Sequence, residues 1–242
     1  MIFEKSKLVE VCKVHAKREE FWNKVETSLE VIKRFYKRGK SYVACSGGKD
    51  SLALTHLIVH NVDSEVIVFH WDHGRWYIPR WIERDVIECI KAIPVKNLII
   101  KHSRYGEDPR CRELSAVKPS FGLRGMYAFI KNVLVKEMGI EVCFLGLRAE
   151  ESCIRKRRTR EYHEFHKGTG TTLVYPLRDW SWLDVWTYII INNIKYPKIY
   201  DIYAKYLGYD KVRLVTFFDK EFEGVGTYYI DQVLLWKWRL NP

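Results

Sequence analysis

The feature that most constrains the fold of this chain is a short loop between a predicted strand and a predicted helix. Residues 46–51 read Ser-Gly-Gly-Lys-Asp-Ser, directly after a β-prone run at 41–45 and before a helical pattern. Glycines let a backbone approach an anion closely, and the first turn of a helix presents unpaired N–H groups at the positive end of its dipole. Phosphate groups bind at such turns. The sequence therefore predicts a phosphate loop, with contacts from Ser46, Gly47, Gly48, Lys49, Asp50 and Ser51.

The spacing within this loop separates it from two common nucleotide-binding motifs. Its glycines and lysine are too close together for G-x-x-x-x-G-K-[ST], and they do not form G-x-G-x-x-G. The alternative is an ordinary strand–helix turn with a chance glycine pair and an exposed lysine. The order of strand, serine, glycine pair, lysine and helix favours the phosphate loop.

Short apolar runs alternate with helical patterns through the middle of the chain. The predicted strands cover 41–45, 66–71, 97–100, 141–145 and 172–175, and helices are predicted after residue 48, near 79–90 and near 125–138. Such alternation is typical of a parallel sheet with helices on both faces. The stretch 103–124 reads as a long loop. We predict one α/β domain at 41–201, a helical extension at 1–40 with one helix or two joined ones, and a helical and aromatic extension at 202–242, including a helix over 228–240.

Composition limits the function classes. The chain has 242 residues and a formal net charge of +11, so its surface attracts polyanions such as nucleotides, sulfate-like substrates or nucleic acid. No apolar run is long enough to span a bilayer, and the first ten residues lack a signal-peptide core, so we expect a cytoplasmic protein without a membrane contact. The six cysteines form no C-x-x-C pair and are expected to be reduced, and His70 and His73 lack a third ligand, so no protein metal site is predicted.

Three further segments carry polar residues at predicted strand ends, where ligands bind in open α/β sheets. Asp72 and Gly74 follow the second strand, although Asp72 could equally be a turn aspartate. After the fourth strand comes G-x-R-x-x-E-S-x-x-R, in which Gly146 permits a tight turn and Arg148 and Arg155 can bind phosphate or sulfate oxygens. A basic run follows at 155–160. The last segment, P-L-x-x-W-x-x-x-D-V-W at 176–186, leads to the pair Tyr196-Pro197 and is interpreted as a fold signature.

Together these segments resemble the PP-loop ATP pyrophosphatase superfamily. Within it the chain is most similar to the phosphoadenylyl-sulfate (PAPS) reductase family, which includes the small subunit of sulfate adenylyltransferase. The resemblance spans about residues 41–201. It implies a Rossmann-like sheet and chemistry at the α-phosphate of an adenine nucleotide. The binding residues that the motifs imply, beyond the phosphate loop, are Asp72, Gly146, Arg148, Ser152 and Arg157.

The resemblance fails near the C-terminus. Reductases of the family use a cysteine there, whereas this chain has no cysteine after Cys153. We therefore expect adenylyl transfer from ATP with pyrophosphate release, in which Lys49, Arg148 and Arg155 offset the charge on the phosphates. The expected ligands are ATP or adenylyl or phosphoadenylyl sulfate with Mg²⁺, for which Asp50 or Asp72 are the candidate protein contacts.

Other functions stay open at this point. They are sulfate activation with a partner subunit, thiolation or another modification of nucleic acid, sulfonucleotide reduction through Cys111 or Cys153, and nucleotide binding without catalysis. The sequence identifies neither the acceptor nor the oligomeric state, and a homodimer or a partner subunit are both compatible with it.

Overall fold

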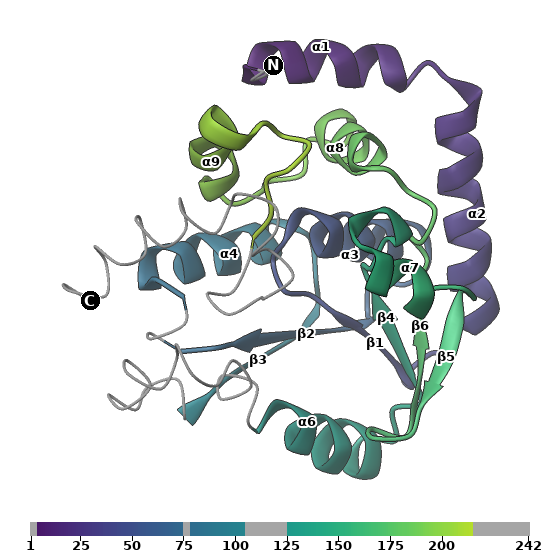
Figure 1. Cartoon of the computed structure of the whole chain (residues 1–242). Coiled ribbons are helices and arrows are strands. Elements are labelled where there is room, and N and C mark those ends of the chain that lie inside the picture. Colours follow the sequence, from purple (N-terminus) through teal and green to yellow (C-terminus); the bar gives the residue numbers. More distant parts are fainter. Residues whose placement is uncertain (1–3, 75–77, 105–124, 215–242) are drawn as a thin grey trace.

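The computed structural model describes residues 4–74, 78–104 and 125–214, without the side chains of residues 206 and 207. Its centre is a six-stranded sheet in the order β3-β2-β1-β4-β6-β5 (Figure 1). The strands are β1 (Ser41–Ala44), β2 (Ile67–Asp72), β3 (Asn97–His102), β4 (Val142–Leu145), β5 (His163–His166) and β6 (Thr171–Val174). All neighbouring pairs are parallel except β5 and β6, which are antiparallel.

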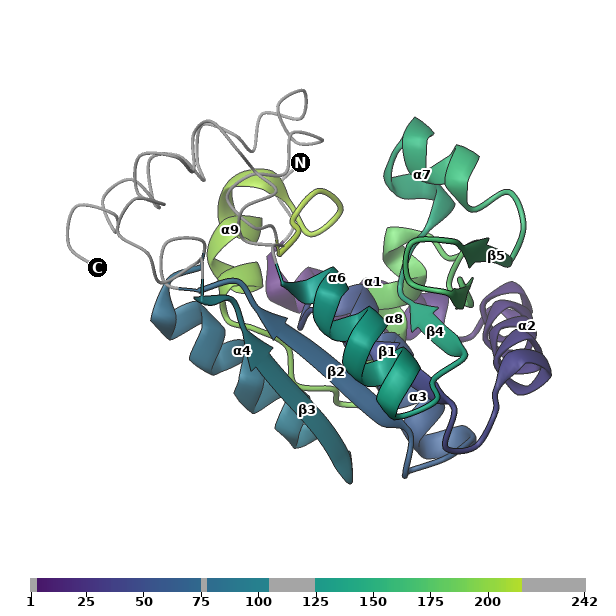
Figure 2. The ribbon, with the colours of Figure 1, turned by 90° about the horizontal axis from the view of Figure 1, so that it is seen from below.

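Helices cover the two faces of the sheet unequally. One face carries α3 (Lys49–Asn61), α4 (Arg80–Ala92) and α8 (Trp182–Ile191). On the other face, the described residues form one helix, composed of α6 (Met126–Phe129) and the π-helical η3 (Ile130–Glu137) (Figure 2). The remaining elements are α1 (Lys5–His15), α2 (Glu19–Phe35), the 3₁₀ turn η4 (Ala149–Glu151), α7 (Cys153–Arg158) and α9 (Ile199–Leu207).

The strands serve two separate hydrophobic clusters because successive side chains point to opposite faces. Val43 and Val68 belong to the large cluster under the several helices. Their neighbours Tyr42 and Phe69 belong to a smaller cluster under η3, together with Leu134. Among the described residues, a single helix covers this second face, which leaves room there for a pocket.

The chain order places a topological switch beside β1. From β1 the chain proceeds outward to β2 and β3, and it then returns to β4 on the other side of β1. The connections after β1 and β4 therefore leave in opposite directions and open a crevice at the carboxyl ends of these strands, where ligands bind in such sheets.

The predicted helices and strands occur close to their expected positions, with one strand missed. The strand predicted at 172–175 is β6, not the fifth strand of the chain, because β5 precedes it. The sequence of β5 is His-Glu-Phe-His, which contains one apolar residue and no alternation, and so it gave no strand signal. Its antiparallel pairing makes the sheet mixed rather than wholly parallel.

The N-terminal segment forms two helices joined near residue 17, and α1 packs against α8 (Figure 1). α9 crosses residue 201, where the predicted nucleotide-binding domain ends. The three-part division of the chain stays a proposal. The helix predicted over 228–240 lies outside the described residues, as does most of the loop at 103–124. Within the described ranges, no helix combines the length and the hydropathy needed to cross a bilayer.

Candidate active site

The loop between β1 and α3 is pressed against α4. Gly47 has a φ of +78°, and a Cβ atom built there would lie 2.2 Å from Cγ1 of Val86 on α4. Both the left-handed backbone and the lack of space require glycine at this position. The neighbouring Gly48 is the residue that precedes the first turn of α3.

Two serine hydroxyls hold the loop in shape. The Ser51 hydroxyl donates to the carbonyl oxygen of Gly48 at 2.9 Å, and it lies 3.2 Å from the Ser46 hydroxyl. The backbone N–H of Gly48 faces the Ser46 hydroxyl at 3.4 Å. Local hydrogen bonds of this kind keep the loop open around a space lined by backbone and hydroxyl groups.

The cations predicted to contact phosphate are turned inward instead. The Lys49 ammonium group donates to Oδ2 of Asp50 at 2.7 Å, and the Arg148 guanidinium donates from Nε to Oδ1 of the same carboxylate. Lys49 and Arg148 are 1% and 3% exposed. Burial opposes ionisation of Asp50, but the charges of Arg148 and Lys49 outweigh it and hold the pKa of Asp50 far below its usual range. This triad fixes the first turn of α3 to the segment after β4. Arg148 also pairs with Glu150 at 3.1 Å, so the two cations are matched by two carboxylates.

Gly146 allows β4 to end directly beside this turn. A Cβ atom there would lie 3.0 Å from the carbonyl group of Asp50 and from the backbone nitrogen of Ser51. The glycine is thus required by the close approach of two backbones. This contact brings the segment after β4 to the phosphate loop, as the motif predicted.

That segment continues into α7 through two ion pairs. The Ser152 hydroxyl accepts a hydrogen bond from the backbone N–H of Arg155 at 3.1 Å and so caps the helix. Arg155 pairs with Glu151, and Arg213 donates to the carbonyl oxygen of Glu151 at 2.9 Å. Arg157 is exposed on α7. Ser152 therefore acts on helix geometry in this structure, and the α7 cations that line the pocket described next are Arg155 and Arg158.

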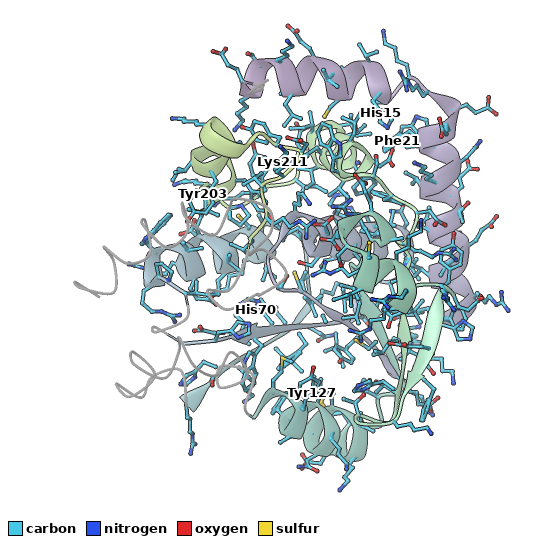
Figure 3. The ribbon with its side chains drawn as sticks, viewed as in Figure 1. His15, Phe21, His70, Tyr127, Tyr203 and Lys211 are labelled. Atoms are coloured by element: carbon cyan, nitrogen blue, oxygen red, sulfur yellow. The ribbon has the colours of Figure 1, made fainter. Side chains whose placement is uncertain are left out.

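A pocket of about 420 Å³ extends from the loop along the thinly covered face of the sheet. Its polar part is lined by Ser46, Gly48, Asp50, Ser51, Gly146, Glu151, Arg155, Tyr200 and Arg213. Its apolar part lies against the strands and α6, with Tyr42, Phe69, Trp71, Met126, Tyr127, Ile130 and Leu173 in its wall. In Figure 3, Tyr127 lies on α6 near the sheet. Arg158, His166 and Thr169 also line the pocket.

Several predicted contacts do not line this pocket. Gly47, Lys49, Asp72, Arg148, Ser152 and Arg157 are absent from its wall. Asp72 is held by Arg80, whose two terminal nitrogens donate to its oxygens at 2.7 and 2.9 Å, and by the Gly74 N–H at 2.8 Å. The next residue, His73, lines the pocket instead. Direct contact of these six residues with a nucleotide stays a prediction.

The carboxylates proposed for Mg²⁺ do not suit direct coordination in this arrangement. Each oxygen of Asp50 and of Asp72 already accepts a hydrogen bond from a cationic side chain. The described residues contain no group of three or more metal-ligating side chains. We therefore derive no step that passes through a protein-bound metal ion.

Tyr200 is the most informative residue that the sequence analysis missed. Its hydroxyl oxygen accepts hydrogen bonds from the backbone N–H of Lys49 at 2.9 Å and of Leu214 at 3.1 Å. These two accepted hydrogen bonds occupy both lone pairs of the hydroxyl oxygen. The hydroxyl proton therefore remains available for donation to a ligand. Tyr200 is 151 positions away from Lys49 along the chain, so the helical pattern of residues 199–207 predicts α9 but gives no sign of this contact.

The cysteines near the pocket are protonated thiols. Cys45 and Cys143 line it, and burial raises the pKa of both, to about 12 for Cys143. Cys153, on α7, is exposed, and Cys111 lies outside the described residues. A thiolate nucleophile at neutral pH is thus not provided by Cys45 or Cys143.

Comparison with known proteins assigns the chain to a family. The model of the phosphoadenosine phosphosulfate reductase domain family matches residues 40–231, well over half of the sequence. The chain belongs to this family. Among its relatives, adenosine 5'-phosphosulfate reductase 2 of Bacillus subtilis is 28% identical over 199 residues, which cover 74% of this chain and 76% of the relative. The family resemblance predicted from the motifs is confirmed.

Solved structures of related fold confirm the Rossmann-like architecture. FMN adenylyltransferase of Candida glabrata, in complex with ATP, matches with a TM-score of 0.54 at 10% identity, covering 82% of this chain and 68% of that one. The U34-tRNA thiolase NcsA of Methanococcus maripaludis matches with a TM-score of 0.51 at 16% identity, covering 72% and 64%. At these identities the likeness to both structures concerns the fold alone.

Proposed function

We propose that the chain binds ATP in the 420 Å³ pocket and transfers its adenylyl group to an anionic acceptor. The strongest support is that one pocket has a polar part beside the loop and an apolar part along the sheet. One part offers serine hydroxyls and backbone N–H groups for a phosphate tail, and the other offers aromatic and aliphatic side chains for a planar base. The family membership points to the same class of ligand, because its relatives are named for adenylyl sulfate.

The proposed reaction is a displacement at the α-phosphorus. An oxygen of the ionised acceptor forms a bond to this phosphorus while the bond to the bridging oxygen of the β-phosphate breaks, and pyrophosphate leaves with the electron pair. Charge grows on the departing group, and Arg155 and Arg213, both in the pocket wall, would offset it. Lys49 and Arg148 lie buried beneath the loop, and their direct contact with the phosphates stays a prediction.

An acceptor that is already ionised fits the pocket wall. The Nδ1 atom of His166 is engaged within the protein, since it lies 2.9 Å from the Thr169 hydroxyl and 3.2 Å from the Thr169 backbone nitrogen. Sulfate or a carboxylate needs no base.

Calorimetric titration of the chain with adenosine, AMP and ATP tests the binding, and pyrophosphate release with sulfate and small carboxylates tests the reaction. We expect Tyr200→Phe to weaken ATP binding about tenfold or more and to leave adenosine binding unchanged. A hydrogen bond to a charged group contributes about 1.5–3 kcal/mol, and about 1.4 kcal/mol is tenfold in affinity. The matched control is Tyr209→Phe, because the Tyr209 hydroxyl donates to Asp201 at 2.8 Å and lies outside the pocket wall.

Two results would contradict the proposal. One is a folded protein that binds none of the three ligands. The other is ATP binding without pyrophosphate release for any acceptor, which would favour a nucleotide-binding subunit that needs a partner.

Reduction of adenylyl sulfate is the second candidate, favoured by the similarity to the Bacillus subtilis reductase. It requires a thiol, and the cysteines in the pocket wall are buried and protonated. Release of sulfite and AMP from adenylyl sulfate in the presence of a dithiol, abolished by Cys111→Ser or Cys153→Ser, would establish this reaction. Sulfite release that neither substitution changes would exclude both cysteines as the thiol of this reaction.

A further inference from the structure

A histidine and a glutamate are buried together directly beneath the phosphate loop. His70, on β2, is 1% exposed and Glu83, on α4, is 3% exposed. The His70 Nε2 atom lies 2.7 Å from Oε1 of Glu83, and its Nδ1 atom lies 2.7 Å from the carbonyl oxygen of Cys45. Figure 3 labels His70 on β2, beside the layer that contains α4.

The carbonyl of Cys45 belongs to the peptide that leads into Ser46, so this ring contact acts on the start of the loop. The same helix contacts the loop a second time, because Val86 on α4 packs against Gly47. Arg80, on the first turn of α4, holds Asp72 at the end of β2. Arg80, Glu83 and Val86 are spaced three residues apart and therefore lie near one face of the helix. This face supports the loop from below.

The hydrogen bonds of His70 determine its protons. A backbone carbonyl oxygen can only accept, and so can an ionised carboxylate. When the Glu83 carboxylate is ionised, both ring nitrogens donate, and the ring is then an imidazolium beside it. Loss of one proton would leave two lone pairs facing each other across one of these 2.7 Å contacts, without water to separate them.

We propose that His70 is a positioning residue for the phosphate loop, kept as an imidazolium by Glu83, and that nucleotide affinity depends on this buried proton. The inference rests on the proposed nucleotide site and adds to it a residue that does not touch the nucleotide. Deprotonation would release the Cys45 carbonyl or the Glu83 carboxylate and so allow the loop to change shape.

The charged groups around the ring favour the same protonation state. Burial lowers the pKa of His70, but the hydrogen bond and charge of Glu83, the Cys45 carbonyl and the charge of Asp72 together raise it above its usual value. Asp72 is paired with Arg80 on α4, and the Cys45 thiol, beneath the loop, is neutral because burial raises its pKa. The ring thus faces Glu83 and Arg80 from α4, Asp72 from its own strand and Cys45 from the loop.

The test compares ATP affinity between pH 6 and pH 9 in wild type, Glu83→Gln and His70→Leu. In wild type we expect affinity to fall as the pH rises through the pKa of His70. Glu83→Gln can donate its amide N–H to Nε2 of a neutral ring, so we expect affinity within about threefold of wild type and no such pH dependence. His70→Leu leaves the Cys45 carbonyl unpaired, and we expect a loss on the order of tenfold.

The matched control is His15→Asn. His15 forms a similar pair with Asp184, Nε2 to Oδ1 at 2.7 Å, on α1 and α8 rather than under the loop. We expect this substitution to leave the pH dependence of ATP affinity unchanged. An equal pH dependence in wild type and Glu83→Gln would overturn the inference.

A second measurement does not require nucleotide binding. Nitrogen-15 NMR of the histidine side chains, with His70→Leu to assign the signal, should show two protonated ring nitrogens for His70 at pH 7. A single protonated nitrogen would overturn the inference even if ATP binds. Two protonated nitrogens in a protein that binds no nucleotide would contradict the proposed function and leave the imidazolium established.

Discussion

At the scale of single residues, the phosphate loop depends on a buried group of charged side chains. Lys49 and Arg148 share the carboxylate of Asp50, and both cations are almost fully buried. A buried charge is costly unless it is paired, so each member of this triad requires the other two. The lysine of the loop motif is thus, in this structure, part of the framework that holds the first turn of α3.

This arrangement predicts that a second substitution partly restores the stability lost by the first. Lys49→Ala should lower the free energy of unfolding by about 3 kcal/mol, because it leaves the Asp50 charge with one partner in a buried site. The double variant Lys49→Ala, Asp50→Asn should recover part of that loss, since Arg148 and Glu150 then remain as a balanced pair. Urea denaturation of the two variants and of Asp50→Asn alone gives the coupling energy. Additive effects of the two substitutions would contradict the buried triad.

At the scale of elements, α4 acts as the support of the loop. Its contacts with Gly47, with His70 and with Asp72 connect two strand ends to one helix face. Each contact is short and comes from a side chain fixed on a helix, so the loop has little freedom to move away from α4. The loop shape is therefore a property of three elements rather than of its own six residues.

Two glycines with similar φ angles distinguish the cost of a left-handed backbone from the cost of a steric clash. Gly47 and Gly39 have φ values of +78° and +71°, but a Cβ atom at Gly39 would meet no atom within 4 Å, whereas one at Gly47 would clash with Val86. Gly39→Ala should cost about 1–2 kcal/mol from the left-handed backbone alone. Gly47→Ala should cost more and should also weaken ATP binding.

Thermal unfolding and ATP titration of both variants check this prediction, and Gly47→Ala with Val86→Ala tests its cause. Removing the Val86 methyl groups should restore part of the ATP affinity of Gly47→Ala. Equal stability losses for Gly39→Ala and Gly47→Ala would show that the contact with α4 is unimportant.

At the scale of the whole molecule, one buried carboxylate joins the N-terminal helices to the α/β core. Asp184, on α8, accepts from His15 on α1 at 2.7 Å, from Lys24 on α2 at 2.8 Å and from the backbone N–H of Ser181 at 2.6 Å. Burial raises the pKa of Asp184, but these hydrogen bonds outweigh it and lower the pKa overall. Its contribution to stability is therefore present above the pKa of an unfolded aspartate and is lost as the pH falls through the lower, folded value.

Asp184→Asn should lower the free energy of unfolding by about 3 kcal/mol near pH 7, because His15 and Lys24 lose a buried anionic partner. It should also reduce the acid sensitivity of the protein, and ATP affinity below the melting range should be unchanged because the pocket lies elsewhere. The control is Glu88→Gln, whose exposed pair with Lys195 should contribute far less to stability because water screens it. Denaturant titrations at pH 4 and pH 7 measure the free energy of unfolding of both variants. Equal losses of stability for Asp184→Asn and Glu88→Gln would contradict the role of Asp184 in holding the N-terminal helices to the core.

The sequence by itself determined the elements that have a local signal. The Gly-Gly turn between a strand and a helix, the alternation of strands with helices, and the three family motifs depend on neighbouring residues, so they can be read without a structure. They gave the α/β class, the family and the loop. β5 was missed because His-Glu-Phe-His carries no alternation, and its pairing with β6 is a contact that forms only in the folded sheet.

Only the tertiary structure decided which side chains line the pocket. Whether Lys49 and Arg148 point to a ligand or to Asp50 depends on burial and on a carboxylate between them, which spacing does not encode. Tyr200, Arg213 and the His70–Glu83 pair come from elements far from the loop in sequence, and folding alone brings them to it. The physical reason is that motifs record backbone geometry over a few residues, whereas the charge and protonation of a buried group depend on all of its neighbours in space.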